Sequence, residues 1–234
     1  MNNQSKAYIY ALITVALWST IGSASKITLR YLQPAEILLI AAAVSSSVLF
    51  FLVLFQRKIP VLLSMRGKDW LISAGYGLLT PFAYYLILLK AYDLLPAQQA
   101  QVINYTWAIT LSLLSIPLLG QKVVGRQWLA IALSYSGVLV IATRGNLLSL
   151  NFENPLGVVL ALLSTILWAL YWILNTRDRR DPLVGLFMNF VCALPFIIIY
   201  TALTKGFRPL PIEGVFGAVY IGVFEMGISF FLWL

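Results

Sequence analysis

The chain has 234 residues, of which 61% are hydrophobic and 10% are charged, and its mean hydropathy is +0.89. Soluble domains contain about 25% charged residues, so this composition excludes a soluble enzyme, a disordered chain and a small disulfide scaffold. The absence of histidine and the single cysteine, Cys192, exclude histidine-based triads, most zinc sites and an internal disulfide framework. The formal net charge of +8 fits the cytoplasmic loops of a membrane protein.

Eight apolar runs are long enough, at roughly 20 residues each, to cross a bilayer as helices. In chain order they cover residues 7–25, 35–55, 70–89, 96–117, 127–143, 155–174, 183–203 and 213–234. The connections between them are short and carry most of the charge. The sequence therefore predicts an all-α, polytopic membrane helix bundle.

The basic residues predict the orientation of this bundle. With the N-terminus inside, ten lysines and arginines lie in inner segments and six in outer ones. Cytoplasmic segments carry the excess of basic residues in membrane proteins. We therefore expect a cytoplasmic N-terminus.

Spans six to eight repeat features of spans one to three. The equivalent pairs are Trp18 and Trp168, Pro34 and Pro182, and Gly77 and Gly222, at offsets of 150, 148 and 145 residues. Repeats of this kind are typical of transporters, and an odd number of helices per unit inverts the second copy. We expect residues 1–145 to form a first five-helix unit and residues 155–234 to contain the first three helices of a second unit.

The sequence stops within an apolar run that ends at Leu234. No polar tail or basic anchor follows this run, as would be usual after a membrane helix. We expect the natural protein to continue for two more helices. A genuine eight-span protein is the alternative.

Glu225 is the only acid that lies well inside a predicted span. It follows Glu213 by twelve residues, which places it about 18 Å deep, near the middle of the bilayer. A carboxylate there must face the bundle interior or a hydrated cavity. It either couples transport to protons or binds a substrate ammonium, or it is a protonated acid that ties two helices together.

The fourth predicted span has a polar side. When successive residues are placed 100° apart around the helix axis, the polar residues fall within an arc of about 120°. They are Gln98, Gln101, Asn104, Tyr105, Ser112 and Ser115. Because lipid cannot hydrogen-bond amides, the arc must face protein or water, either lining a pathway or bonding helix to helix.

The first and sixth spans carry similar faces with a tryptophan on each. These faces comprise Ala11, Thr14, Trp18, Gly22 and Ser25, and Ala161, Ser164, Trp168, Tyr171, Trp172 and Asn175. Tryptophans usually lie at headgroup depth, but Trp18 and Trp168 lie about two-thirds of the way along their spans. Such aromatic walls could stack on a planar or cationic substrate, and helix packing is the alternative. Pro81 and Pro195 interrupt the third and seventh spans.

Four stretches carry a resemblance to a known family. They are Ala16-Leu17-Trp18-Ser19-Thr20, Asn104-Tyr105-Thr106-Trp107, Leu118-Leu119-Gly120-Gln121-Lys122 and Leu167-Trp168-Ala169-Leu170-Tyr171. They resemble the EamA-type permeases of the drug/metabolite transporter superfamily, and most of all the branch of aromatic amino acid exporters. The chain departs from that branch at Ala108, where the branch usually has a proline.

The resemblance implies ten helices in two inverted five-helix repeats, of which this chain holds eight, with both termini cytoplasmic. It also implies a central cavity lined largely by helices 1, 3, 4, 6, 8 and 9. Around that cavity we expect the substrate-binding residues Trp18, Asn104, Tyr105, Trp168, Tyr171 and Glu225.

The function that follows is a secondary transporter of the inner membrane that exports small metabolites by alternating access. Amino acids, including aromatic ones, are the leading substrates. The partners we expect are the lipid bilayer, the small-molecule substrate and protons. We expect no nucleic acid, cofactor or metal, and no enzyme activity. The alternatives are a proton-coupled exporter of cationic drugs and a non-transporting membrane fragment.

Overall fold

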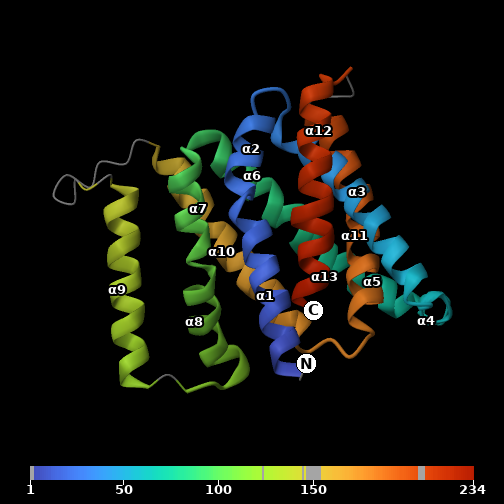
Figure 1. Cartoon of the computed structure of the whole chain (residues 1–234), viewed down its shortest axis with the longest axis horizontal. Coiled ribbons are helices and arrows are strands. Elements are labelled where there is room, and N and C mark those ends of the chain that lie inside the picture. Colours follow the sequence, from blue (N-terminus) through green and yellow to red (C-terminus); the bar gives the residue numbers. More distant parts are fainter. Residues whose placement is uncertain (1–2, 123, 144, 146–153, 205–208) are drawn as a thin grey trace. The chain divides into compact units, whose positions relative to one another are not determined.

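The computed structural model describes residues 3–122, 124–143, 145, 154–204 and 209–234. The chain divides into two compact units, each built of helices (Figure 1). The first unit comprises Met1–Phe82 and Arg179–Leu234, and the second comprises Ala83–Asp178. Each unit draws on both of the sequence repeats expected above, so the repeat boundaries stay a prediction.

The regular structure of the described residues is helical, which confirms the all-α membrane bundle. Among these residues, seven helices have the length and composition of membrane spans. They are Gln4–Thr28, Pro34–Phe55, Gly67–Leu94, Ala97–Leu119, Pro155–Asn175, Pro182–Thr204 and Ile212–Trp233. The span expected at residues 127–143 is an 18-residue helix, Gly125–Ala142, outside this set of seven. The count of eight spans therefore stays a prediction.

The first unit begins with α1 (Asn3–Ser19), α2 (Ile21–Thr28), α3 (Pro34–Phe55), α4 (Ile59–Leu63) and α5 (Gly67–Gly77). After the second unit it continues with α11 (Pro182–Thr204), α12 (Ile212–Tyr220), the π-helical segment η2 (Ile221–Ile228) and α13 (Ser229–Trp233). The helix α3 is central, because α11, α12 and η2 all pack against it. In turn, α5 packs on α11, and α13 packs on α1.

Local sequence fixes where the central helices begin. Pro34 occupies the first turn of α3, where its missing N–H costs nothing. The Glu36 carboxylate accepts a hydrogen bond from the Gln33 backbone N–H at 2.8 Å, which satisfies a donor at the helix start. The helix α11 begins in the same way. Pro182 is its first residue, and the Asp181 carboxylate accepts a hydrogen bond from the Val184 N–H at 3.1 Å.

Two glycines let backbones approach closely in the first unit. A Cβ built on Gly77 of α5 would lie 2.3 Å from the carbonyl oxygen of Asn189 in α11. A Cβ on Gly222 of η2 would lie 2.7 Å from the carbonyl oxygen of Ala41 in α3. Asn189 follows Ala41 by 148 residues, the offset that relates Pro182 to Pro34. The two contacts are thus equivalent under the offsets of the sequence repeat.

The third span is broken, as its proline indicates. It leaves α5 through η1 (Leu78–Ala83), in which Thr80 has the extended dihedral angles φ −145° and ψ 122°. Pro81 follows and cannot donate a backbone hydrogen bond. Pro195, by contrast, lies within the continuous helix α11.

The second unit consists of α6 (Tyr84–Leu94), α7 (Ala97–Tyr105), α8 (Trp107–Leu119), α9 (Gly125–Ala142) and α10 (Pro155–Asn175). Its centre is α10, which packs against α6, α7 and α8. The Asn154 side chain accepts from the Gly157 N–H at 2.9 Å and caps the start of α10. Gly120 ends α8 with a φ of +69°, a conformation that glycine adopts without strain.

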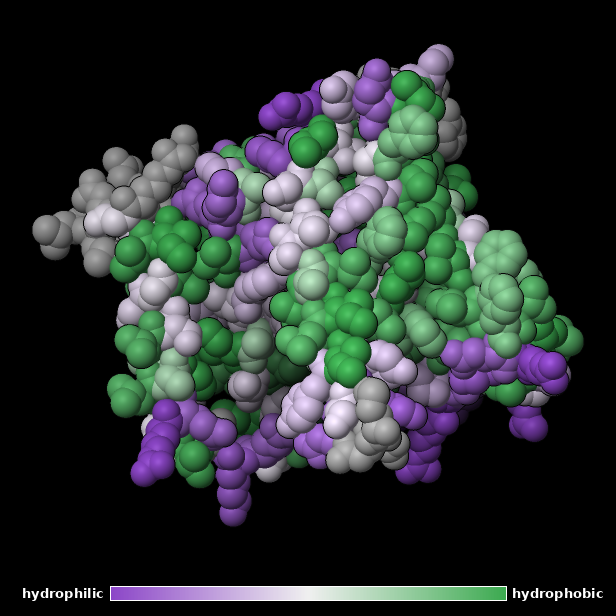
Figure 2. Space-filling view, viewed as in Figure 1, coloured by the Kyte–Doolittle hydropathy of each residue, from purple (hydrophilic) through white to green (hydrophobic). Residues whose placement is uncertain are grey.

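Large apolar side chains cover the outer faces of several helices. Figure 2 shows hydrophobic side chains along α9 in one unit and along α12 in the other, with hydrophilic ones gathered near helix ends. Leu129 and Leu133 of α9 are 72% and 73% exposed, and Leu203 of α11 is 82% exposed. Water does not tolerate so much exposed apolar surface, whereas lipid does. These faces therefore fit a bilayer.

Candidate substrate-binding residues

An aromatic cluster surrounds Trp168 of α10 in the second unit. The ring of Tyr84 in α6 lies 4.5 Å from that of Trp168, between centroids, with an interplanar angle of 32°. Trp172 is 5.6 Å and Tyr171 6.4 Å from Trp168 along the same helix, and Trp107 of α8 is 6.3 Å away. These separations suit stacked and edge-on aromatic pairs. Trp168 and Tyr171, both predicted from the sequence, are therefore neighbours.

The amide of Asn104 lies against the polar side of this cluster. Its Nδ2 donates to the hydroxyl of Ser164 in α10 at 2.9 Å and, at 3.5 Å, to the hydroxyl of Tyr84. Because Asn104 is only 4% exposed, these bonds fix the amide in place. Tyr84 is thus shared between the amide and the ring of Trp168.

Tyr105, the residue after Asn104, does not contribute to the Trp168 cluster as the structure describes it. It is 39% exposed, and its hydroxyl accepts from the Gln101 side chain at 3.1 Å. The helix is interrupted at Thr106, between α7 and α8. The residues of the fourth span therefore do not follow a single helical periodicity of 100° per residue. The polar arc expected for this span accordingly divides, with Asn104 and Ser115 buried and Tyr105 and Ser112 exposed.

In the first unit, Trp18 lies near the end of α1. Its ring centroid is 5.2 Å from that of Trp233 in α13, at an interplanar angle of 45°. Thr14, Gly22 and Ser25 of the expected face are buried with it. The hydroxyl groups of Thr20 and Tyr220, on α12, are 2.9 Å apart just beyond this point. The junction of α1 and α2 thus contacts α12 and α13 through aromatic and hydroxyl groups.

Glu225 lies within η2 and is 6% exposed. A π-helical turn widens the backbone spacing, and such turns often mark functional sites. The neighbouring helix α3 packs along η2, and the Ser45 hydroxyl of α3 donates to the Gly222 carbonyl at 2.7 Å. The carboxyl group is therefore held inside a packed region of the first unit, as its depth in the span predicts.

Charged groups also order a connection of the first unit outside its spans. Lys58 Nζ lies 2.8 Å from the Asp181 carboxylate. Partial burial would raise the pKa of Asp181, but the hydrogen bonds from Lys58 and from the Val184 N–H bring this pKa below its ordinary value. Arg180 donates to the Asp69 carbonyl at 2.8 Å and to the Ser73 hydroxyl at 2.6 Å. These bonds tie the start of α11 to α5.

Sequence reasoning missed Tyr84 and Tyr220. Tyr84 follows the break in the third span, where no periodic pattern marks one helical face. Tyr220 could have been noticed as a polar ring five residues before Glu225. Among the described residues, no three His, Cys, Asp or Glu side chains form a group able to hold a metal ion.

The side chains of the cluster have the chemistry to contact a flat or positively charged group. Aromatic faces stack on planar groups and attract cations, and an amide together with a phenol can hydrogen-bond a carboxylate. Buried polar and aromatic groups on apolar membrane helices are typical of a polytopic membrane protein.

The chain belongs to the EamA-like transporter family, whose sequence model matches residues 5–143 and 155–234. Two proteins of Archaeoglobus fulgidus, each described as an uncharacterized transporter, are similar to it. They are 24% and 21% identical, over 98% and 97% of this chain and 79% of each relative. A crystal structure with a TM-score of 0.69 and 21% identity covers 98% of this chain and 78% of its own, which shows the shared fold. The chain is therefore a multi-pass membrane protein of a transporter family.

Proposed function

We propose that the chain is a secondary transporter that exports small metabolites by alternating access, and that amino acids, including aromatic ones, are its substrates. The observation that carries this proposal is the Trp168 cluster with Asn104 at its edge. A zwitterionic amino acid needs acceptors and donors for its two charges and an apolar wall for its side chain. The cluster offers aromatic faces for the ammonium and the side chain, and the amide for the carboxylate.

Alternating access requires the buried cluster to become accessible. In the described conformation, Trp168 is 2% and Tyr171 is 1% exposed. A substrate would have to separate these rings and replace their contacts by its own, so substrate binding and helix movement would be coupled. The broken third span and the π-helical η2 supply backbone interruptions at which transporter helices bend.

A binding measurement tests the residues. Purified chain should bind labelled tryptophan, and Trp168→Leu should weaken that binding about two- to twelvefold, since an aromatic pair contributes about 0.5–1.5 kcal/mol beyond its buried area. Trp70→Leu is the matched control, because Trp70 lies on α5 in the first unit and is 37% exposed. Equal binding by both variants would contradict the assignment of Trp168.

Glu225 favours a second candidate, proton-coupled export of lipophilic cations. It is the one acid located well inside a span, and a buried carboxylate can exchange a proton for a cationic solute. Glu225→Gln should then abolish cation efflux driven by a proton gradient while the protein still inserts into membranes. Glu213→Gln, at the start of α12, is the control. Efflux by Glu225→Gln at the wild-type rate would refute this role.

We further propose that the protein lies in the inner membrane with its N-terminus in the cytoplasm. The excess of ten basic residues over six supports this orientation. A cysteine introduced at residue 3 should react with an impermeant thiol reagent only after the membrane is opened. Reaction in intact cells would contradict the orientation.

A further inference from the structure

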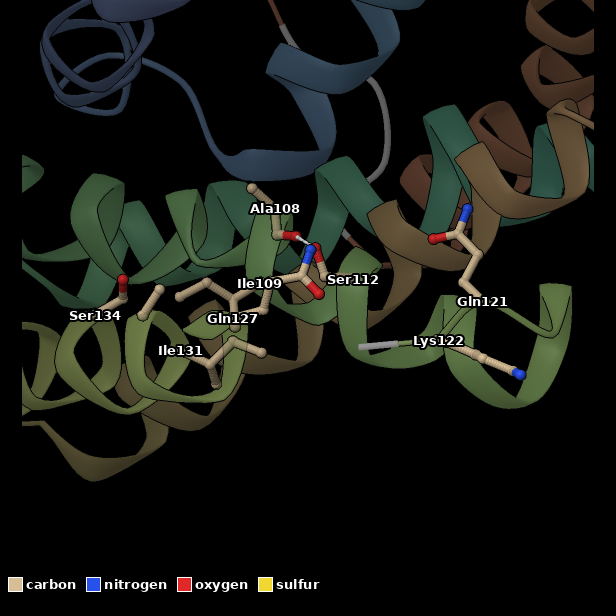
Figure 3. Close-up of a pocket in the computed structure, with 9 residues that line it drawn as sticks. Ala108, Ile109, Ser112, Gln121, Lys122, Gln127, Ile131 and Ser134 are labelled. Carbon is tan, nitrogen blue, oxygen red and sulfur yellow. Dashed lines mark hydrogen bonds between the residues drawn. The ribbon is translucent and has the colours of Figure 1, made fainter. Parts of the chain in front are cut away.

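A groove separates α8 from α9 in the second unit. It encloses a cavity of about 330 Å³. Figure 3 shows the wall from α8, with Ala108 and Ile109, facing the wall from α9, with Ile131. Gln121 and Lys122, on the connection between the helices, lie at one end of the groove.

The groove exists because α9 packs loosely. Within the described part of α9, every side chain is exposed or partly exposed, and its main neighbour is α7 rather than α8. The small side chains of Ala108 and Ala130 leave the space between the facing helices unfilled. The walls are mixed, because Ala108, Ile109, Ala130 and Ile131 are apolar whereas Ser112, Gln127 and Ser134 are polar. A space with both kinds of wall between membrane helices suits an amphipathic molecule such as a lipid.

The end of the groove at Lys122 is positively charged. Arg126 lies in the first turn of α9, and the Arg177 guanidinium donates to the Leu118 carbonyl at the end of α8. The sequence from residue 94 to residue 152 contains no acid, and Asp178 is the acid next to Arg177. Lys122 is the charged residue of the groove lining, and Arg126, Arg177 and Asp178 lie outside the lining, close to this end in the sequence or through the Leu118 contact.

The polarity of the groove changes along its length. Trp128, 50% exposed in the first turn of α9, is of the type that anchors helices at headgroup depth. Seven residues separate Gln127 from Ser134, so the groove runs about 10 Å from that level toward the hydrocarbon region. Lys122 thus lies at headgroup level, and the apolar side chains of Ile109 and Ile131 lie deeper, together with the hydroxyl groups of Ser112 and Ser134.

We propose that this groove holds one anionic phospholipid, with its phosphate at Lys122 and Arg126 and an acyl chain between α8 and α9. A basic pocket between membrane helices attracts an anionic headgroup. The Gln121 amide can donate to the phosphate or glycerol oxygens, while Ile109 and Ile131 contact the chain. A small polar solute would leave these apolar walls uncovered, and an uncharged lipid would leave the cations without a counter-charge.

Native mass spectrometry of the full chain tests the site, with phosphatidylglycerol titrated against phosphatidylcholine of the same chain length. Wild type should retain one phosphatidylglycerol at concentrations at which it retains no phosphatidylcholine. The double variant Lys122→Gln/Arg126→Gln should bind phosphatidylglycerol about tenfold or more weakly. The matched control Arg66→Gln/Lys68→Gln, which removes two cations at the start of α5, should bind it as wild type does.

The acyl-chain part of the site is tested without a change of charge. Ala130→Trp fills the groove and should abolish retention of the lipid. Ala132→Trp, two residues along α9 and outside the groove lining, should leave retention intact. Equal retention of the two lipids by wild type, equal losses in the two double variants, or full retention by Ala130→Trp would each overturn the proposal.

Discussion

Replacing Gly77 by alanine should force α5 away from α11. The new Cβ would lie 2.3 Å from the Asn189 carbonyl oxygen and 3.1 Å from the Ala193 backbone nitrogen. Real Cβ atoms essentially never approach other atoms closer than 3.0 Å, and the opposing atoms are backbone, which cannot rotate away. The two helices must therefore separate.

A control variant on the same helix separates the destabilisation caused by the steric contact of Gly77→Ala from other effects of the substitution. Overpacking a tight contact costs about 1–3 kcal/mol, whereas alanine in place of glycine in a helix gains up to about 1 kcal/mol. Gly75→Ala receives the same helix-propensity gain, but its Cβ meets nothing within 4 Å. The difference between the two variants isolates the contact at about 1–3 kcal/mol.

Thermal denaturation in mild detergent measures this difference. For a chain of this size, 1 kcal/mol shifts Tm by roughly 2–4 °C. Gly77→Ala should therefore melt about 2–12 °C below Gly75→Ala. A Tm for Gly77→Ala equal to or above that of Gly75→Ala would refute the close approach of α5 and α11.

Three further perturbations follow from individual contacts. Gly222→Ala should destabilise the protein by a similar amount, about 1–3 kcal/mol, because its Cβ would lie 2.7 Å from the Ala41 carbonyl oxygen. A Tm at or above that of wild type would contradict this close contact. Asn154→Ala should lower stability by about 1 kcal/mol through loss of the cap on α10, and Asn154→Asp, which keeps the acceptor, should restore it in the same melt. The Asp181 pKa is lowered on folding, so its stabilisation is complete above the ordinary value of 3.8 and is lost as pH falls through the folded-state pKa. Wild type should therefore melt above Asp181→Asn at pH 6, and the difference in Tm should narrow as the pH falls below 3.8; a difference that stays constant as the pH is lowered would contradict the lowered pKa.

The seven spans found among the described residues could be predicted from the sequence, because each depends on hydrophobic length. The span predicted at residues 35–55 corresponds to α3, Pro34–Phe55, in the structure. Its start is determined by Pro34 and by the hydrogen bond to Glu36. The break in the third span was signalled by Pro81, since proline removes a helix hydrogen bond. No comparable signal precedes the break at Thr106, so the sequence predicts one continuous helix for the fourth span.

The candidate site could be predicted only where one helix carries it. Trp168 and Tyr171 share α10, and their spacing placed them on one buried face. Tyr84 reaches Trp168 from α6, and Ser164 meets Asn104 across two helices. Such contacts depend on how helices pack, which helical periodicity within one segment does not determine.

Counterflow in proteoliposomes tests the central claim most directly. Vesicles that contain the purified chain would be loaded with unlabelled amino acids and diluted into labelled phenylalanine, tryptophan or threonine, with protein-free vesicles as the control. A carrier that alternates access predicts transient accumulation of at least one labelled amino acid above its equilibrium level, reduced by Trp168→Leu. Accumulation no greater than in protein-free vesicles, for every amino acid supplied, would contradict an amino acid transporter.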